Sequence, residues 1–232
     1  MSDFTTETIS FEVNGRTAHG HLALPAGAGQ GAGVVVIQEW WGLEEHIKDV
    51  ANRFAAQGFV ALAPDLYYGE VATEPDEARK LAMSLRQEFD QALAAIQASI
   101  DLLLAHERVS SRSVGITGFC MGGGLAWHGA AKLKGIGAAV PFYGGAAEMS
   151  DAEVAQITCP VLAIFGELDA GVSPEVAQAR AAQMDQAGVA HETIIYPKAQ
   201  HAFFNDTRAA YDLEAATDAW NRMTQLFNEA LS

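Results

Sequence analysis

Short apolar runs alternate along the chain with longer segments in which apolar residues recur every three or four positions. The runs at residues 34–38, 59–63 and 161–165 are almost wholly apolar, which is typical of strands covered on both faces. Strands that alternate with helices form βαβ units, whose strands lie parallel. The sequence therefore predicts an α/β fold with a mostly parallel central sheet of about eight strands and helices on both faces.

The individual elements can be placed from this pattern. We expect strands at residues 6–13, 20–24, 34–38, 59–63, 113–117, 137–142, 161–165 and 192–196. We expect helices at residues 44–57, 76–106, 121–132, 174–186 and 207–228, the second of them with a break near Gln87. A turn at Asn14-Gly15 joins the first two strands as a hairpin. No repeat or linker interrupts the pattern, so we expect one domain over residues 1–232.

The chain is acidic, with 14 Lys and Arg against 29 Asp and Glu and a net charge of −15. Nucleic acids and anionic membranes are bound by clustered basic residues, so we expect neither as a partner, but a small-molecule substrate and a monomer or small homo-oligomer. Residues 1–14 lack the basic start and apolar run of a signal peptide. We therefore expect a cytoplasmic protein in which Cys120 and Cys159 form no disulfide.

Cofactors are not expected either. The glycine-rich residues 27–33 precede a strand, whereas a dinucleotide-binding loop follows one. His19 and His21 are too isolated to indicate a metal site, and no paired Cys-x-x-Cys motif occurs.

The strongest candidate for chemistry is the segment Gly118-Phe119-Cys120-Met121-Gly122, which joins a predicted strand directly to a predicted helix. It has the form of the G-x-S-x-G turn with a thiol in place of the hydroxyl, and such a turn needs small neighbours. A thiol at a helix N-terminus is favoured as the thiolate nucleophile, and the backbone N–H of Met121 can donate to an oxyanion. Cys159 precedes a strand, at the wrong end of the sheet, and is expected to be structural.

A thiol nucleophile needs a base, and the base needs an acid that orients it. His201 follows the last predicted strand, and Asp169 follows the strand before it, in the order nucleophile, acid, base that is typical of α/β-hydrolases. Glu167 is an alternative to Asp169, but we favour Asp169.

Glu39 is a further candidate, because it ends a buried strand and precedes Trp40 and Trp41. Burial would raise its pKa and allow it to exchange a proton with the thiol. The alternative is that Glu39 caps the helix that begins near Glu44.

Taken together, the motifs resemble those of the dienelactone hydrolase family of α/β-hydrolases, over residues 6–227. The segments that carry the resemblance are Gln38-Glu39, Ala63-Pro64-Asp65-Leu66-Tyr67, Gly118-Phe-Cys-Met-Gly-Gly123, Gly166-Glu-Leu-Asp169 and His201-Ala-Phe203. The resemblance implies the α/β-hydrolase fold and the hydrolysis of an ester or lactone, as by a carboxymethylenebutenolidase, through a thioester acyl-enzyme and without a cofactor.

The resemblance also implies roles for individual residues. It implies a triad of Cys120, His201 and Asp169, and a Glu39 that lies close to the resting thiol and takes part in its activation. The implied oxyanion donors are the backbone N–H groups of Met121 and Trp40.

The substrate pocket departs from the family pattern. An Arg that binds a substrate carboxylate shortly after the catalytic His is missing, and Phe204 or Asn205 stands in its place; Ala202 replaces a Ser. Arg79 or Arg86 could supply a cation instead. Further candidates for substrate binding are aromatic: Trp41, Tyr67, Tyr68, Tyr143 and Phe203. This composition favours a neutral or apolar ester.

Two other classes of function remain open from the sequence. A binding protein could keep this fold without activity, although it would not need a complete triad. A thiol redox protein would need a resolving cysteine, and Cys159 is predicted to be remote from Cys120.

Overall fold

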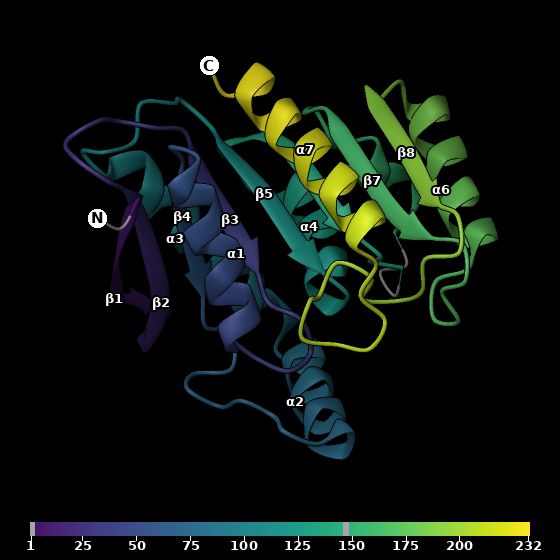
Figure 1. Cartoon of the computed structure of the whole chain (residues 1–232), viewed down its shortest axis with the longest axis horizontal. Coiled ribbons are helices and arrows are strands. Elements are labelled where there is room, and N and C mark those ends of the chain that lie inside the picture. Colours follow the sequence, from purple (N-terminus) through teal and green to yellow (C-terminus); the bar gives the residue numbers. More distant parts are fainter. Residues whose placement is uncertain (1–2, 146–148) are drawn as a thin grey trace.

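The computed structural model describes residues 3–145 and 149–232, and its centre is an eight-stranded sheet (Figure 1). The strands are β1 (Phe4–Val13), β2 (Arg16–Pro25), β3 (Gly33–Ile37), β4 (Val60–Pro64), β5 (Val114–Phe119), β6 (Ile136–Phe142), β7 (Val161–Gly166) and β8 (His191–Tyr196). They are ordered β1-β2-β4-β3-β5-β6-β7-β8. β2 is antiparallel to both its neighbours, and all pairs from β4 to β8 are parallel. The predicted mostly parallel α/β sheet is confirmed.

The hairpin at the start of the chain has the predicted turn. Val13 pairs with Arg16, and the two residues between them, Asn14 and Gly15, have φ values of 52° and 79°. Two successive left-handed residues give the tight turn that Asn-Gly favours, and it fixes the register of β1 against β2.

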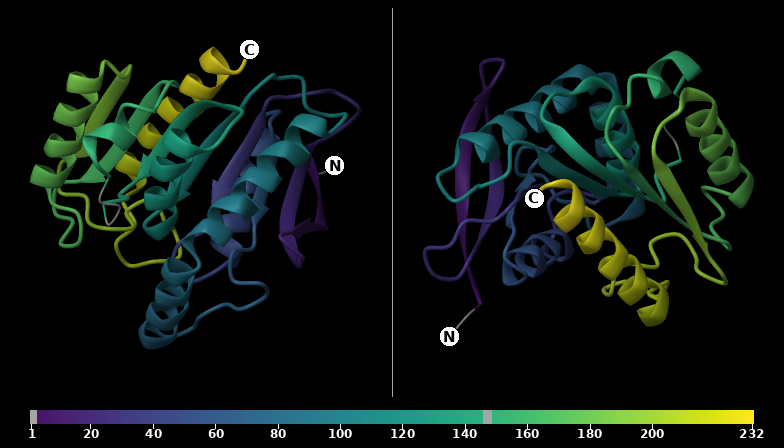
Figure 2. Two further views of the ribbon diagram at one scale, coloured as in Figure 1. Left: turned by 180° about the vertical axis from the view of Figure 1, so that it is seen from behind. Right: turned by 90° about the horizontal axis from the view of Figure 1, so that it is seen from above.

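Helices cover both faces of the sheet (Figures 1 and 2). They are α1 (Glu45–Ala56), α2 (Pro75–Gln87), α3 (Phe89–Ala105), α4 (Met121–Lys132), α5 (Asp151–Val154), α6 (Pro174–Ala187) and α7 (Leu213–Ala230). Alternate residues of β3 divide between two apolar clusters: Val34 and Val36 pack with α1 and α7, and Val35 and Ile37 pack with α3, α4 and α6. The period of two along a strand thus builds one core on each face.

Helix α2 has a different position from the others. It lies beyond the carboxyl ends of the central strands, below their arrowheads in Figure 1. It is bound loosely, since Ala78 and Leu85 are its only buried residues. In a parallel sheet the loops at this edge carry the functional residues, so α2 faces the place where a site is expected.

Element boundaries agree with the sequence prediction to within two residues except at two starts: β2 begins at Arg16 rather than at residue 20, and the last helix begins later than predicted. The long helical segment is divided at Glu88 into α2 and α3, close to the break predicted at Gln87. The prediction that the last helix begins at Thr207 is wrong: α7 begins at Leu213, because the Asp212 side chain accepts the Ala215 N–H at 3.1 Å and caps the helix there. The short helix α5 was not predicted.

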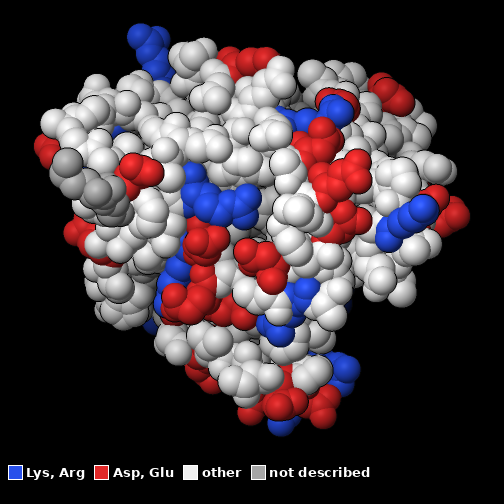
Figure 3. Space-filling view, viewed as in Figure 1, with Lys and Arg blue, Asp and Glu red and all other residues white. Residues whose placement is uncertain are grey.

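The surface agrees with the acidic composition. On the face shown in Figure 3, basic side chains are scattered among acidic ones rather than gathered in one patch. Within residues 3–145 and 149–232, no helix combines the length and apolar character needed to cross a bilayer.

Candidate active site

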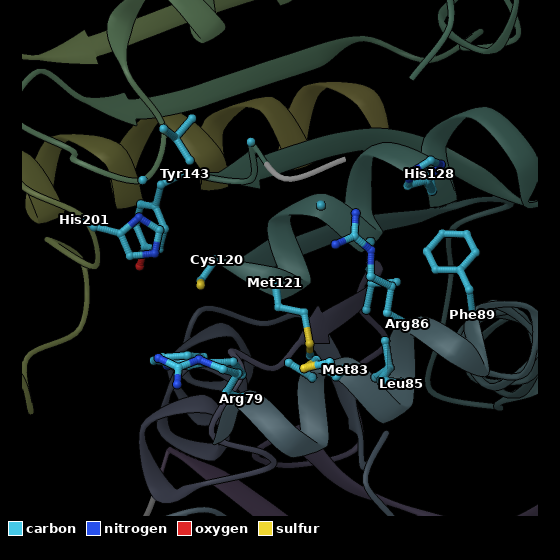
Figure 4. A pocket seen from close by; sticks show the side chains of 17 residues that line it. Arg79, Met83, Leu85, Arg86, Phe89, Cys120, Met121, His128, Tyr143 and His201 are labelled. Atoms are coloured by element: carbon cyan, nitrogen blue, oxygen red, sulfur yellow. The ribbon is translucent and has the colours of Figure 1, made fainter. Parts of the chain in front are cut away.

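Four loops at one edge of the sheet bring the predicted catalytic side chains together. Glu39 follows β3, Cys120 follows β5, Asp169 follows β7 and His201 follows β8. Cys120 and His201 line one end of a cavity of about 650 Å³ (Figure 4).

The turn that carries Cys120 depends on glycine. Cys120 has φ 56° and ψ −113°, an unfavourable conformation for a residue with a side chain, and it directly precedes the first residue of α4. A Cβ at Gly118 would lie 2.2 Å from the Gly122 carbonyl oxygen, and a Cβ at Gly122 would lie 2.4 Å from the Gln38 carbonyl oxygen. Only glycine fits at either position, so the sequence of this turn fixes the thiol at the helix N-terminus.

The imidazole of His201 is held by Asp169. The His201 Nδ1 lies 2.7 Å from Asp169 Oδ2, and Asp169 Oδ1 accepts the N–H groups of Gly171 at 2.7 Å and Val172 at 2.9 Å. The alternative acid, Glu167, is exposed and accepts the backbone N–H of Lys198 at 2.8 Å instead. Asp169 is therefore the carboxylate that orients the imidazole.

His201 also interacts with Cys120, and this alters its titration. Burial by itself would lower the pKa of His201, but hydrogen bonds to Asp169 and Cys120, with the charges of both, outweigh burial and raise the pKa to about 10. The imidazole is consequently protonated at neutral pH.

Glu39 follows β3 and is buried at the same edge of the sheet as Cys120. It is 1% exposed, its Oε2 accepts the side-chain N–H of Asn205 at 2.9 Å, and its Oε1 has no hydrogen-bond partner among the described residues. Burial raises the pKa of Glu39 to about 7, and the Asn205 hydrogen bond partly opposes that rise. The capping alternative fails, because Glu44 is the N-cap residue of α1 and no side chain caps it.

Tyr143 completes this end of the cavity. Its ring centroid lies 5.0 Å from that of His201, and its buried hydroxyl has no hydrogen-bond partner among the described residues. Burial, followed by the charges of Glu39 and Cys120, raises the pKa of Tyr143 well above its usual value. The hydroxyl therefore stays protonated and can donate a hydrogen bond.

Of the other predicted substrate-binding residues, Arg79 lines the cavity, as does Trp40, the predicted oxyanion donor. The Arg79 guanidinium forms an exposed ion pair with Asp76 at 2.9 Å. Arg86 also lines the cavity and makes no ion pair with any described residue.

Tyr67 does not line the cavity within the described part of the chain; it lies behind the wall. Its hydroxyl is 3.2 Å from the Trp40 carbonyl oxygen and 3.3 Å from the Met121 sulfur. Tyr67 therefore contacts both Trp40 and Met121, the two residues whose backbone N–H groups are the predicted oxyanion donors.

Trp41, Tyr68 and Phe203 are likewise absent from the described cavity wall. The Arg208 guanidinium lies 4.2 Å from the centroid of the Trp41 ring, and Arg16 lies 3.6 Å from that of Tyr68. Phe203 is fully buried in the core. These three side chains stabilise the surrounding fold rather than the cavity surface.

The sequence did not identify the far wall of the cavity. That wall includes Ala82, Met83 and Leu85 of α2, Phe89 of α3, Leu125 and His128 of α4, and Val172. The sequence offers one signal for this wall, the helical spacing of the α2 and α4 residues. That spacing does not show which faces of the two helices lie opposite each other.

Metal ligands were also sought among the described residues. No group of three or more His, Cys, Asp or Glu side chains there could hold a metal ion, and both cysteines are free thiols. Cys159 is buried, and burial raises its pKa to about 11, which makes it unreactive.

Comparison with known proteins agrees with this geometry. Residues 18–231 match the model of the dienelactone hydrolase family. The chain belongs to this family. The family predicted from the sequence is thus confirmed, and with it the enzyme class, a hydrolase of esters or lactones.

Relatives in this family align over nearly the whole chain. "Protein usf" of Aquifex pyrophilus is 38% identical over 97% of this chain and 99% of its own. A protein of Aquifex aeolicus, named "Putative carboxymethylenebutenolidase", is 34% identical over the same shares. The crystal structure of a dienelactone hydrolase-like promiscuous phosphotriesterase from metagenomic libraries superposes with a TM-score of 0.88, at 25% identity over 99% of this chain and 100% of that one.

Proposed function

We propose that this dienelactone hydrolase family member cleaves a neutral carboxylic ester or lactone through a Cys120–His201–Asp169 triad and a thioester acyl-enzyme. The observation that carries the proposal is the hydrogen-bonded His201–Asp169 pair beside a thiol on a strained strand-to-helix turn, all at one end of a cavity.

In the first step the Cys120 thiolate attacks the substrate carbonyl carbon and forms a C–S bond, and the carbonyl electron pair moves to oxygen. The N–H groups of Met121 and Trp40 stabilise this oxyanion. Met121 supports that role because it is the first residue of α4, where the N–H has no partner within the helix. When the tetrahedral intermediate collapses, the ester C–O bond breaks, and protonated His201 donates its proton to the leaving alkoxide.

In the second step water releases the acid from the thioester. Acylation removes the negative charge of Cys120, which is one of the causes of the raised pKa of His201. The pKa of the imidazole therefore falls, and His201 can take a proton from water as hydroxide attacks the thioester carbonyl. Breakage of the C–S bond releases the acid and regenerates the thiolate, and His201 keeps the proton that it took from water.

Glu39 has an auxiliary role in this proposal. With a pKa of about 7 it can hold or release a proton near the thiol at physiological pH. It is placed to exchange a proton with Cys120 before the substrate reacts.

The preference for a neutral substrate rests on Asn205, whose side chain bonds to Glu39 and supplies no positive charge to the cavity. Phe204 or Asn205 stands where the family pattern has an Arg, and the Asn205 side chain is fully buried and bonded to Glu39 and Thr207. An amide cannot replace the two-pronged hydrogen bonding of a guanidinium to a carboxylate. Of the two cations that line the cavity, Arg79 is already paired with Asp76, and Arg86 is an exposed residue of α2.

Hydrolysis of p-nitrophenyl acetate by the wild type, Cys120→Ala and Cys120→Ser tests the proposal. We expect Cys120→Ala to be inactive and Cys120→Ser to retain little turnover, because an alkoxide is harder to form than a thiolate. Trapping a thioester by mass spectrometry would identify the intermediate. Full activity of Cys120→Ala would overturn the proposal, and an inactive wild type would favour a binding protein. Peroxide consumption lost in Cys120→Ala would favour the redox alternative.

A further inference from the structure

The cavity extends well beyond the reactive groups. One face of α4 forms its floor: Met121, Leu125 and His128 follow one another at helical spacing, away from Cys120 (Figure 4). Seven residues of helix correspond to about 10 Å. The opposite wall is the face of α2 that carries Ala82 and Met83.

The extension is apolar along most of its length. We call it the distal arm and define it by Ala82, Met83, Leu85, Phe89, Leu125 and His128. Leu85 and Leu125 are 8% and 3% exposed. The edge of the His128 ring contacts Phe89, with centroids 4.9 Å apart.

The charged residues that line the cavity are Arg79 and Arg86, and Figure 4 shows Arg86 between Met121 and His128. Burial, and then the charge of Lys132, lowers the pKa of His128, so its ring is neutral at physiological pH. Arg79 and Arg86 are both exposed and can keep their guanidinium groups in water while their stems cover the apolar wall. A charged group buried in the arm would find no carboxylate and no buried cation among the described lining residues.

The direction of the arm relative to His201 assigns it to one side of the scissile bond. In Figure 4 His201 and Tyr143 lie on one side of Cys120, and the arm residues His128 and Phe89 lie on the other. Because His201 must protonate the leaving alkoxide, the alcohol portion of the substrate lies on the His201 side. The acyl portion then extends in the opposite direction.

We infer that the distal arm binds the acyl chain of the substrate, and that the preferred substrates are esters of unbranched apolar acids of medium length. The inference rests on the proposed thioester mechanism, since the orientation follows from the role of His201. The length of the arm along α4 and its apolar wall select for acyl length.

Two substrate series test the orientation. For p-nitrophenyl acetate, butanoate, hexanoate and octanoate, we expect kcat/KM to rise by roughly tenfold or more before it levels off, because each buried methylene contributes at most about fourfold. For ethyl, butyl and hexyl acetate, followed by release of acid, we expect a change of less than about threefold, since the alcohol gains little apolar contact.

Two variants of α2 test whether the rise of kcat/KM with acyl length depends on the distal arm. Ala82 is half-buried on the cavity wall, so Ala82→Trp should fill the arm and abolish the rise of kcat/KM from acetate to octanoate, measured as the ratio of the two values. Ser84→Trp is the matched control: Ser84 is exposed on the same helix and does not line the cavity, so the length preference should persist.

The outcomes separate this inference from the proposed function. Cys120-dependent acetate hydrolysis with no rise along the acyl series, or a rise along the alcohol series instead, would overturn the inference and leave the mechanism intact. An unchanged acyl preference in Ala82→Trp would also overturn it. Loss of Cys120 dependence would remove the mechanism itself.

Discussion

Asp169 and Glu39 are two carboxylates at the same edge of the sheet, and both are almost completely buried, with exposures of 4% and 1%. Their surroundings differ sharply. Asp169 accepts hydrogen bonds from two backbone N–H groups and lies against His201, so both of its oxygens have partners. Glu39 has one amide partner, Asn205, and its second oxygen has none among the described residues.

The comparison shows that partners, rather than burial, decide what a buried carboxylate does. An acid with hydrogen-bond donors on both oxygens stays ionised and can fix an imidazolium, whereas an acid with one donor gains a proton readily. The same sheet edge thus holds a carboxyl group with hydrogen-bond partners on both oxygens beside the imidazole, and a second carboxyl group whose pKa is about 7.

The largest effect is expected at Asp169. Asp169→Asn should lower kcat by about 10³–10⁴-fold, because an amide neither stabilises the protonated imidazole nor fixes its tautomer. Steady-state hydrolysis of p-nitrophenyl acetate measures this. Glu167→Gln, on the same loop but exposed and bonded only to the Lys198 backbone, is the control and should stay near wild type. Equal losses in both variants would show that the loop, not the triad, is affected.

Glu39→Gln should change the pH dependence of thiol reactivity. Below about pH 6 Glu39 is protonated and resembles Gln, so both proteins should react alike with iodoacetamide. Above pH 7 the wild type carries an extra negative charge on Glu39 at the same edge of the sheet. This charge disfavours the thiolate, so the wild type should contain less of the reactive form and should be alkylated more slowly than the variant, by roughly tenfold for charges several ångströms apart. The rate of alkylation against pH measures this.

Glu44→Gln is the control for Glu39→Gln. It removes a neighbouring charge that helps to raise the pKa of Glu39, so the inflection near pH 7 should persist and move slightly to lower pH. If the alkylation rates of the wild type and Glu39→Gln depend on pH in the same way, Glu39 does not influence the thiol. Slower alkylation of Glu39→Gln above pH 7 would identify Glu39 as a proton acceptor instead.

Asn205 should tune this titration. In Asn205→Ala the ionised form of Glu39 loses the hydrogen bond from the Asn205 amide, so the inflection should move up by about one pH unit, the size expected of a hydrogen bond to a charged group. The control is Thr207→Ala, which removes a donor to the amide oxygen of Asn205 and leaves the bond to Glu39 in place. If Asn205→Ala and Thr207→Ala show the same dependence of alkylation rate on pH, the hydrogen bond from Asn205 does not set the pKa of Glu39.

The sequence was sufficient wherever the signal is local. Helix α4 occupies the predicted residues 121–132, because the turn before it and the helix follow from neighbouring residues. The strand ends that carry Cys120, Asp169 and His201 follow from apolar runs, and the edge at which parallel strands end is a general rule.

Contacts between distant segments could not be predicted in this way. The bond between Glu39 and Asn205 joins residues 166 positions apart, and nothing in either segment indicates the other. Residue type alone also could not show which aromatic side chains line the cavity and which belong to the hydrophobic core. Tyr143 lines the cavity, whereas Phe203 is buried in the core. The sequence likewise did not show that α2 lies across the strand ends and supplies the distal arm.

The smallest expected effect concerns stability. The pKa of Glu39 is about 7 in the folded protein, against an ordinary value of 4.5. Between these pH values the folded state binds more protons than the unfolded state, so this group makes the free energy of unfolding fall as pH rises from 4.5 to 7. Gln cannot ionise, and Glu39→Gln should escape that loss. The raised pKa of His201 affects both proteins and largely cancels in their difference.

The Tm of Glu39→Gln should therefore gain on that of the wild type as pH rises from 5 to 8, by on the order of 5 °C, since 1 kcal/mol corresponds to roughly 2–4 °C in a chain of this length. Scanning calorimetry at several pH values measures the difference. Glu107→Gln, at an exposed carboxylate, should show a difference that does not vary with pH. A flat difference for Glu39→Gln as well would mean that its carboxyl group ionises as readily as one in water, and the contrast with Asp169 would then be one of position alone.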